Sequence, residues 1–256
     1  MDRIERYFTG KNLARRLGRA HVGDFLEINS NSMSGWEEDF QGDTFKAGAA
    51  PANYQSTASG AAAATAAIST GVVNGAALLD AGTDDNGRSD LSWGRHYRGD
   101  LHAIYVARFS INVLTTRKFE IGFTDVISGT DAGAVDVKAT PTFNATDAVV
   151  LIYDTDDDTN LTLVGNKAGT AATVADFSTA LVADTYYYFG VALEDDNARG
   201  FLLNADGALL EEEFIEDAVT ETVLLTPWLF VQNRAANAGS MTLDWHKAYQ
   251  RRTTSS

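Results

Sequence analysis

The dominant pattern in this chain is an alternation of apolar and polar residues with a period of two, which begins near residue 33. Between residues 103 and 112, for example, one face of an extended strand would carry Tyr105, Ala107, Phe109 and Ile111. Turns rich in Asp, Gly and Asn separate the alternating segments. The pattern predicts strands at 103–112, 117–124, 148–153, 160–164, 186–193, 199–204, 208–214, 228–232 and 241–249.

Strict alternation also predicts which side chains face the core in two of these strands. Residues 117–124 would place three apolar side chains on one face: Phe119, Ile121 and Phe123. The polar residues of that strand would share its other face: Lys118, Glu120 and Thr124. In 241–249, the inward side chains would be those of Met241, Leu243 and Trp245. The outward side chains of the same strand would then be those of Thr242, Asp244 and His246.

Residues 47–77 differ from the rest of the chain because they are rich in Ala, Gly, Ser and Thr. A linker is one interpretation, but 66–70 and 72–79 can supply flat strands of small residues, and we favour strands. No predicted strand is followed by a crossover helix, which argues against an α/β fold. Many short antiparallel strands with tight turns predict an all-β fold, a two-sheet jelly-roll sandwich over residues 31–252.

The first 30 residues form a separate unit in this interpretation. Leu13 and Leu17 lie four positions apart, so we expect a short helix over about residues 11–18, ended by Gly18 and Gly23. An isolated helix of that length needs a partner surface to persist in water. The sequence therefore predicts an extended, partly helical N-terminal arm at 1–30, and a short tail at 253–256.

Charge is divided between these units. Residues 1–21 hold six bases and two acids, residues 22–246 hold 11 bases and 33 acids, and residues 247–256 hold three bases and no acid. An acidic body with basic ends indicates that the ends bind something negative, such as the body of a neighbouring identical subunit. The residues expected to make this contact are Arg3, Ile4, Arg6, Tyr7, Phe8, Lys11, Leu13, Arg15, Arg16, Leu17 and Arg19.

Composition excludes several classes of function. The chain has no cysteine, so it has no disulfide framework and no thiolate chemistry, which fits folding in a reducing cytoplasm. It contains no apolar run long enough to span a membrane, and charged residues stand where a signal peptide needs its apolar segment. The acidity of the body argues against nucleic acid as its main ligand.

The order of strands and turns resembles a known group of proteins. The residues that carry the resemblance are GVVNGAALLDAGTDDNG, YVARFSI, FEIGFTDV, AVVLIYDTD, YYYFGVALEDDNARGFLLNADGALL and TPWLFVQNRAANAGSMTLDWHKAYQRR. Over roughly residues 60–252 the chain resembles the concanavalin A-like (laminin-G-like) sandwich domains of tailed-bacteriophage structural proteins. In that group an ARF-type strand is followed by an IGFTD-type strand, and later by a hairpin with a DG turn.

The resemblance implies a non-enzymatic virion protein, in the first place a capsid decoration or cement protein attached to the shell through its arm. It would be made in the host cytoplasm and reside on the capsid surface. Its partners would be the major capsid protein or other virion subunits, together with further copies of itself. The alternative is a carbohydrate-binding adhesion module of a tail or fibre, with a glycan as ligand.

An acidic run offers the best candidate for a metal site. Oxygen-bearing side chains alternate at Asp154, Asp156, Asp158 and Asn160, as they do in the opening of a calcium-binding loop. Position six of that template is Thr159 instead of Gly, however, and position twelve lacks the required Glu. We therefore favour a hairpin turn with no cofactor, and a looser calcium site remains the alternative.

The sequence contains no recognisable set of catalytic residues. A retaining glycosidase needs two carboxyl groups about 5–5.5 Å apart, and Glu211 and Glu213 are the nearest approximation. The four histidines form no metal-binding pair, and we expect them at surfaces or interfaces. On the body, the loop SWGRHYRGD is expected to be exposed and to offer the best ligand or subunit contact, through Trp93, Arg95, His96, Tyr97 and Arg98.

Overall fold

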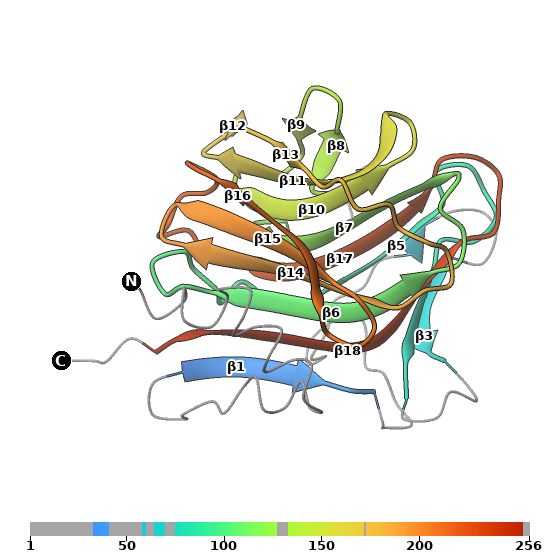
Figure 1. The fold of residues 1–256 in the computed structure, drawn as a ribbon, viewed down its shortest axis with the longest axis horizontal. Helices are drawn as coiled ribbons and strands as arrows, with labels where there is room; N and C mark the ends of the chain where they lie inside the picture. The colour runs from blue at the N-terminus through green and yellow to red at the C-terminus, as the bar shows by residue number, and fades with distance from the viewer. Residues whose placement is uncertain are drawn as a thin grey trace.

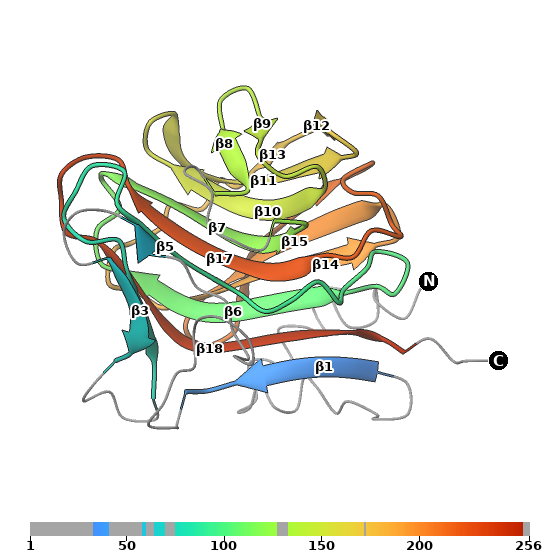
Figure 2. The same cartoon turned by 180° about the vertical axis from the view of Figure 1, so that it is seen from behind.

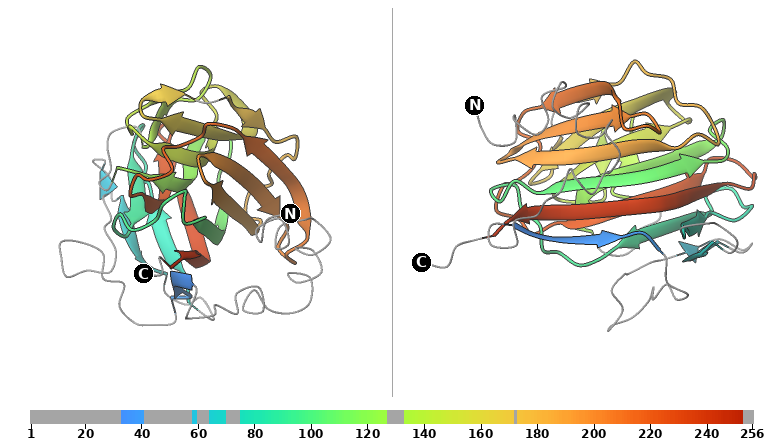
Figure 3. Two further views of the ribbon diagram at one scale, coloured as in Figure 1. Left: turned by 90° about the vertical axis from the view of Figure 1, so that its left-hand side faces the viewer. Right: turned by 60° about the horizontal axis from the view of Figure 1, so that its bottom comes forward.

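The protein is a two-layer β-sandwich. The computed structural model describes residues 33–40, 58–59, 64–69, 75–126, 133–171 and 173–252. Within these ranges there is no helix, and the chain forms two eight-stranded antiparallel sheets and one two-stranded sheet. Figures 1 and 2 show the molecule from opposite sides, and Figure 3 shows the layers from two further directions. The predicted all-β, two-sheet architecture is confirmed.

Sheet 1 contains the first and the last strand of the described chain. Its order is β16-β15-β14-β6-β18-β4-β3, and β1 pairs with the part of β18 that lies beyond β4. The strands are β16 (Leu209–Ile215), β15 (Asn197–Leu203), β14 (Tyr187–Glu194), β6 (Ile104–Ile111), β18 (Ser240–Arg251), β4 (Ala77–Asp80), β3 (Thr65–Ile68) and β1 (Met33–Glu38).

Sheet 2 forms the other layer. Its order is β12-β11-β10-β7-β17-β5-β2, and β13 also pairs with β11. The strands are β12 (Thr170–Ala171), β11 (Asp158–Lys167), β10 (Ala148–Asp154), β7 (Arg117–Thr124), β17 (Thr226–Asn233), β5 (Arg88–Ser92), β2 (Ala58–Ser59) and β13 (Ala175–Asp176). A small hairpin of β8 (Val135–Val137) and β9 (Thr142–Phe143) lies beside β10 and β11 (Figures 1 and 2).

The main core fills the space between the two sheets. It is formed by the apolar residues that the period-two pattern of each strand points inward. In β7, the predicted inward residues Phe119, Ile121 and Phe123 are fully buried in this core. Phe109 of β6 stacks on Phe189 of β14 at 4.2 Å between ring centroids, and it meets Phe119 edge-on at 5.6 Å. Aromatic pairs in such geometries add about 0.5–1.5 kcal/mol beyond the burial of their area.

The alternation fails at one point, in β18. Leu243 pairs with Phe109 and Trp245 pairs with Arg108, so Asp244 is an extra residue, a β-bulge. Every side chain after the bulge therefore faces opposite to the prediction. Trp245 packs on the outer face of sheet 1, and His246 is fully buried in the core. The predicted orientations of these two residues are wrong for this reason.

The predicted strands otherwise match the observed ones to within a few residues. In the small-residue region, β3 confirms a strand where 66–70 was expected, and β4 overlaps the predicted 72–79. The N-terminal arm at 1–30, its expected helix and the tail at 253–256 lie outside the described residues. In the described part of the chain, no helix has the length and apolarity needed to cross a membrane.

Candidate functional site

The outer face of sheet 1 carries a group of half-buried aromatic and charged side chains, which we call the aromatic patch. It consists of Arg108, Tyr186, Tyr188, Asp244 and Trp245. The bulge at Asp244 creates this patch, because it turns the indole of Trp245 outward next to Arg108. Arg108 also pairs with Tyr188 across β6 and β14, so the three side chains form one row across the sheet.

Arg108 lies at the centre of the aromatic patch. Its guanidinium carbon lies 4.4 Å from the ring centroid of Tyr186 and 5.7 Å from that of Tyr188. Its Nη1 donates to the Asp244 carboxylate at 2.5 Å. Tyr188 and Trp245 meet edge-on at 6.4 Å, and burial raises the pKa of the Tyr188 phenol. The patch thus consists of three aromatic rings held in place by their contacts with one another and with the Arg108–Asp244 ion pair.

A second ion pair borders the patch at the edge of the sheet. Glu37 of β1 accepts hydrogen bonds from the Trp245 indole at 3.0 Å and from Lys247 at 2.7 Å. Partial burial alone would raise the pKa of Glu37, but these two hydrogen bonds and the charge of Lys247 outweigh it and lower that pKa. Trp245 is therefore held in place from both sides, by Tyr188 and by Glu37.

An apolar cluster continues the same outer face beyond the patch. Its members are nearly inaccessible to solvent: Ile104, Val106, Ala192, Phe201, Leu203 and Tyr249. Gly190 makes this packing possible, because a Cβ there would lie 2.0 Å from Cζ of Phe201. The ring of Phe201 can therefore lie across β14. Outer sheet faces in contact with water are usually polar, so this cluster is unusual.

The outer face of sheet 2 is closed instead. The β8–β9 hairpin packs on it, and the residues between them form a second small core around Val135, Val150, Trp228 and Phe230. Glu120 of β7 holds the hairpin in place. Its carboxylate accepts from the backbone amides of Ala134 at 2.8 Å and Val135 at 3.2 Å, and from the Trp228 indole at 2.8 Å.

Lys118 completes this buried centre. Its Nζ lies 3.2 Å from Oε1 of Glu120, and neither side chain is accessible to solvent. Burial lowers the pKa of Lys118, and the charge of Glu120 opposes that effect only in part. The prediction that Lys118 and Glu120 share the outer face of their strand is confirmed. Their roles here are structural, because hydrogen bonds to the hairpin occupy the carboxylate.

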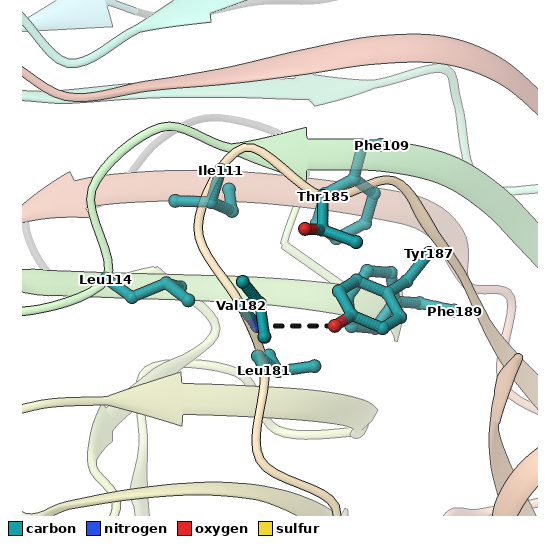
Figure 4. Close-up of a pocket in the computed structure, with 8 residues that line it drawn as sticks. All are labelled: Phe109, Ile111, Leu114, Leu181, Val182, Thr185, Tyr187 and Phe189. Carbon is teal, nitrogen blue, oxygen red and sulfur yellow. Dashed lines mark hydrogen bonds between the residues drawn. The ribbon is translucent and has the colours of Figure 1, made fainter. Parts of the chain in front are cut away.

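One small cavity opens at an end of the sandwich, beside the loop that leads into β14 (Figure 4). Its walls are Phe109, Ile111, Leu114, Leu181, Val182, Thr185, Tyr187 and Phe189. The cavity measures about 10 Å³, which is room for about one water molecule. The Tyr187 hydroxyl accepts from the Val182 amide at 3.3 Å, so the wall is closed by its own contacts.

The loop SWGRHYRGD is only partly exposed, and the predicted exposure of two of its residues is wrong. Trp93 is 7% exposed and Tyr97 is 5% exposed, and both belong to the main core. The Tyr97 ring packs on Phe123, and an isolated bridge joins Tyr97 to the chain ahead of β17. Arg95 and His96 are exposed, and Arg98 forms an ion pair with its neighbour Asp100.

The acidic run at 154–160 is a hairpin turn between β10 and β11, as favoured from the sequence. Its carboxylates meet basic side chains. Arg234 donates to Asp154 at 2.8 Å and lies 3.4 Å from Asp156, and Lys138 forms an ion pair with Asp158 and donates to the Asn160 carbonyl. These cations relieve the repulsion that would favour calcium. Among the described residues, no three or more His, Asp or Glu side chains gather in a way that could hold a metal ion.

Glu211 and Glu213 lie on β16, the edge strand of sheet 1. Hydrogen bonds from the amides of Ser178 and Thr179 outweigh the effect of burial and lower the pKa of Glu211. Burial, with the charges of Glu211, Asp176 and Glu212, raises the pKa of Glu213. The opposite pKa shifts of the two carboxyl groups resemble those of an acid–base pair, but the Glu211 carboxylate is already hydrogen-bonded to Ser178 and Thr179 at the sheet edge.

Most basic side chains of the body are engaged within the sandwich. The ion pairs join Arg98 with Asp100, Arg108 with Asp244, Lys118 with Glu120, Lys138 with Asp158, Lys167 with Asp196 and Asp217, Arg199 with Glu194 and Glu212, and Arg234 with Asp154 and Asp156. The excess charge that the sandwich presents to a partner is consequently negative.

Comparisons with known proteins identify the fold. No protein-family profile matches the sequence, and no curated protein is significantly similar to it. A solved structure from Shewanella oneidensis MR-1, described as a protein of unknown function, matches with a TM-score of 0.61 and 16% identity over 88% of this chain and 90% of that one.

Two further solved structures carry descriptions of function. Peanut lectin matches with a TM-score of 0.54 and 10% identity, over 87% of this chain and 99% of that chain. The CBM2 module of the evolved Dit protein from Lactobacillus casei BL23 phage J-1 matches with a TM-score of 0.51 and 12% identity, over 86% and 96%. The Emp47p carbohydrate-recognition domain (TM-score 0.50, 14% identity, 78% of this chain and 89% of that one) and a Bacillus licheniformis beta-glucanase (TM-score 0.50, 11% identity, 85% and 98%) have the same architecture. At these identities the likeness establishes a lectin-like, concanavalin A-like fold.

Proposed function

We propose that this chain is a non-enzymatic structural protein of a virus particle, in the first place a capsid decoration protein attached to the shell through its N-terminal arm. The observation that carries the proposal is the division of charge. Residues 1–21 have a net charge of +4, whereas residues 22–246 have a net charge of −22 and engage most of their bases internally. The arm is a strongly basic segment that lies outside the predicted sandwich.

An arm of this kind would bind through more than its charges. Exposed ion pairs contribute only about 0–1 kcal/mol each and weaken with salt, so a stable attachment needs apolar anchors as well. The arm contains them at Ile4, Tyr7, Phe8, Leu13 and Leu17. Its partners would be the major capsid protein, other virion subunits or further copies of this chain, on the outer surface of the shell. The likeness in fold to the CBM2 module of a phage Dit protein supports a setting in a virus particle.

Attachment can be tested on particles that lack the protein. Deleting residues 1–21 should abolish binding to such particles while the circular dichroism of the sandwich is unchanged. A matched pair of variants then separates the arm from general basicity. Arg15→Gln with Arg16→Gln should reduce occupancy, and Arg251→Gln with Arg252→Gln, which removes the same charge at the other end, should reduce it less. Full occupancy after the deletion would defeat the proposal.

The aromatic patch favours a second candidate, a carbohydrate-binding adhesion module. Sugar rings bind to aromatic faces flanked by side chains that form hydrogen bonds, and Tyr186, Tyr188 and Trp245 with Asp244 supply both. This function predicts glycan binding by the full chain that Trp245→Ala abolishes. Trp36→Ala, which removes another partly exposed tryptophan outside the patch, serves as the control. A glycan array that stays blank with and without calcium would count against this candidate.

A further inference from the structure

A second group of side chains on sheet 1 repeats the chemistry of the aromatic patch. It consists of Glu194 of β14, Arg199 of β15, and Glu212 and Phe214 of β16, and we call it the edge group. The guanidinium carbon of Arg199 lies 5.2 Å from the ring centroid of Phe214. Nε of Arg199 donates to Glu194 at 3.0 Å, and its Nη1 donates to Glu212 at 2.8 Å. Both groups therefore combine an arginine, an aromatic ring and a carboxylate.

The edge group and the aromatic patch lie on the same face of the sheet. Arg199 is opposite Ala192, a member of the outer apolar cluster, and Phe214 is opposite Arg199, so both side chains point outward. Arg108 is opposite Tyr188, which precedes Ala192 by four residues on β14. At about 3.4 Å per residue and 4.8 Å per strand, the two arginines lie about 17 Å apart across this face.

The surface at and between the two groups is partly accessible. Phe214 is 39% exposed, and Trp245 is half-buried at the other end. Tyr188 and Leu209 are half-buried as well, and they pack on the apolar cluster beneath them. The face thus offers an aromatic ring with a paired arginine at each end, and apolar side chains between the two ends.

This repeated arrangement fits a chain of neutral sugars. A sugar ring presents C–H bonds to an aromatic face, and its hydroxyl groups accept from a guanidinium and donate to a carboxylate. Within each group the ionised side chains hold one another in place, so little ordering is needed when a ligand binds. Residues 22–246 have a net charge of −22, which repels sugars that carry carboxylate, sulfate or phosphate groups.

We propose that the edge group is a second sugar subsite, and that the outer face of sheet 1 binds one neutral glycan chain that reaches from the aromatic patch to the edge group. This inference rests on the carbohydrate-binding candidate for the aromatic patch. Once a sugar unit is bound at the patch, the edge group meets the rest of the same chain at a high effective concentration. Affinity therefore increases with chain length until both groups are occupied.

The test measures how the affinity of the full chain depends on the length and charge of the glycan. Isothermal titration calorimetry uses galacto-, gluco- and manno-oligosaccharides from the disaccharide to the octasaccharide, with oligogalacturonates as anionic counterparts. In a neutral series that binds, affinity should rise with length and then stay constant once the chain spans both groups. The oligogalacturonates should show no binding, and binding as tight as that of a neutral series would contradict the proposal.

Variants of the edge group separate the second subsite from the first. Phe214→Ala should lower the affinity for the octasaccharide about tenfold and leave that for the disaccharide unchanged. Phe214→Trp keeps an aromatic face and should retain the gain with length. Val137→Ala, which removes an exposed apolar side chain from the hairpin over sheet 2, is the matched control and should bind as the wild type does.

The possible results distinguish this inference from the candidate function on which it rests. Equal affinity for the disaccharide and the octasaccharide would overturn the second subsite while the carbohydrate-binding candidate stands. An equal loss for both ligands in Phe214→Ala would overturn it in the same way. Absence of binding to every neutral series would defeat the carbohydrate-binding candidate and this inference together.

Discussion

His246 should make the sandwich sensitive to acid, and the size of the effect follows from its surroundings. The imidazole is fully buried, stacked on Phe40 at 5.3 Å and edge-on to Trp93 at 4.6 Å. Burial lowers its pKa from 6.5 to about 3. In the unfolded chain the group titrates near 6.5, so between these values the unfolded state binds more protons.

The contribution of His246 to stability is complete above pH 6.5 and is lost as the pH falls towards 3. The loss relative to pH 7 is about 3 kcal/mol at pH 4.5 and approaches about 5 kcal/mol below pH 3, at 1.36 kcal/mol per unit. Because domains are stable by only about 5–15 kcal/mol, this loss is a large fraction of the total.

His246→Phe keeps an aromatic ring in the same site and removes the titration. Urea unfolding at pH 7 and pH 4.5 should show that the variant loses about 3 kcal/mol less than the wild type between these two values. His96→Gln, which removes an exposed imidazole, serves as the matched control and should lose as much as the wild type. Equal losses in wild type and His246→Phe would refute the reasoning.

Three further changes test the packing. Glu120→Gln would bury the ammonium of Lys118 opposite a neutral amide, and urea unfolding should show a loss of about 3–5 kcal/mol, largely recovered when Lys118→Met is added. Deletion of Asp244 removes only the extra residue and leaves Trp245 opposite Arg108 and His246 opposite Ala107, so a thermal melt should still show a cooperative transition, and loss of that transition would contradict the assignment of the bulge. Gly190→Ala should cost about 1–3 kcal/mol by clashing with the Phe201 ring, and Phe201→Leu should recover part of that cost.

The sequence predicted the fold because alternation, turn residues and strand order all agreed. β7 matches its predicted range and its predicted faces, since Phe119, Ile121 and Phe123 leave only one way to bury the strand. The loop around Trp93 was misjudged because its polar neighbours, Arg95 and His96, dominate the local composition. Only the tertiary bridge of Tyr97 to the segment ahead of β17 brings the two aromatic rings into the core.

The aromatic patch could not be predicted, because it depends on a single inserted residue. The local sequence MTLDWHKAY is equally compatible with a bulge at Asp244 and with a regular strand in which Asp244 points outward. The decisive signal is non-local: β6 presents Arg108 opposite Trp245 and Ala107 opposite His246. The small side chain of Ala107 leaves room for an imidazole in the core, whereas Arg108 provides a partner for an outward indole.

The two outer faces of the sandwich therefore have different capacities for binding. The outer face of sheet 2 is occupied by the β8–β9 hairpin, and Glu120 accepts from the amides of Ala134 and Val135 at that hairpin as well as from Trp228 and Lys118 of the sheet. A ligand could reach this face only by breaking those contacts, each worth more than the usual 0.5–1.5 kcal/mol because one partner is charged. The outer face of sheet 1 has no comparable buried ion pair among its described residues, and its aromatic patch is half-exposed. A capsid subunit or a glycan that binds this sandwich should thus contact the side that the bulge at Asp244 has shaped.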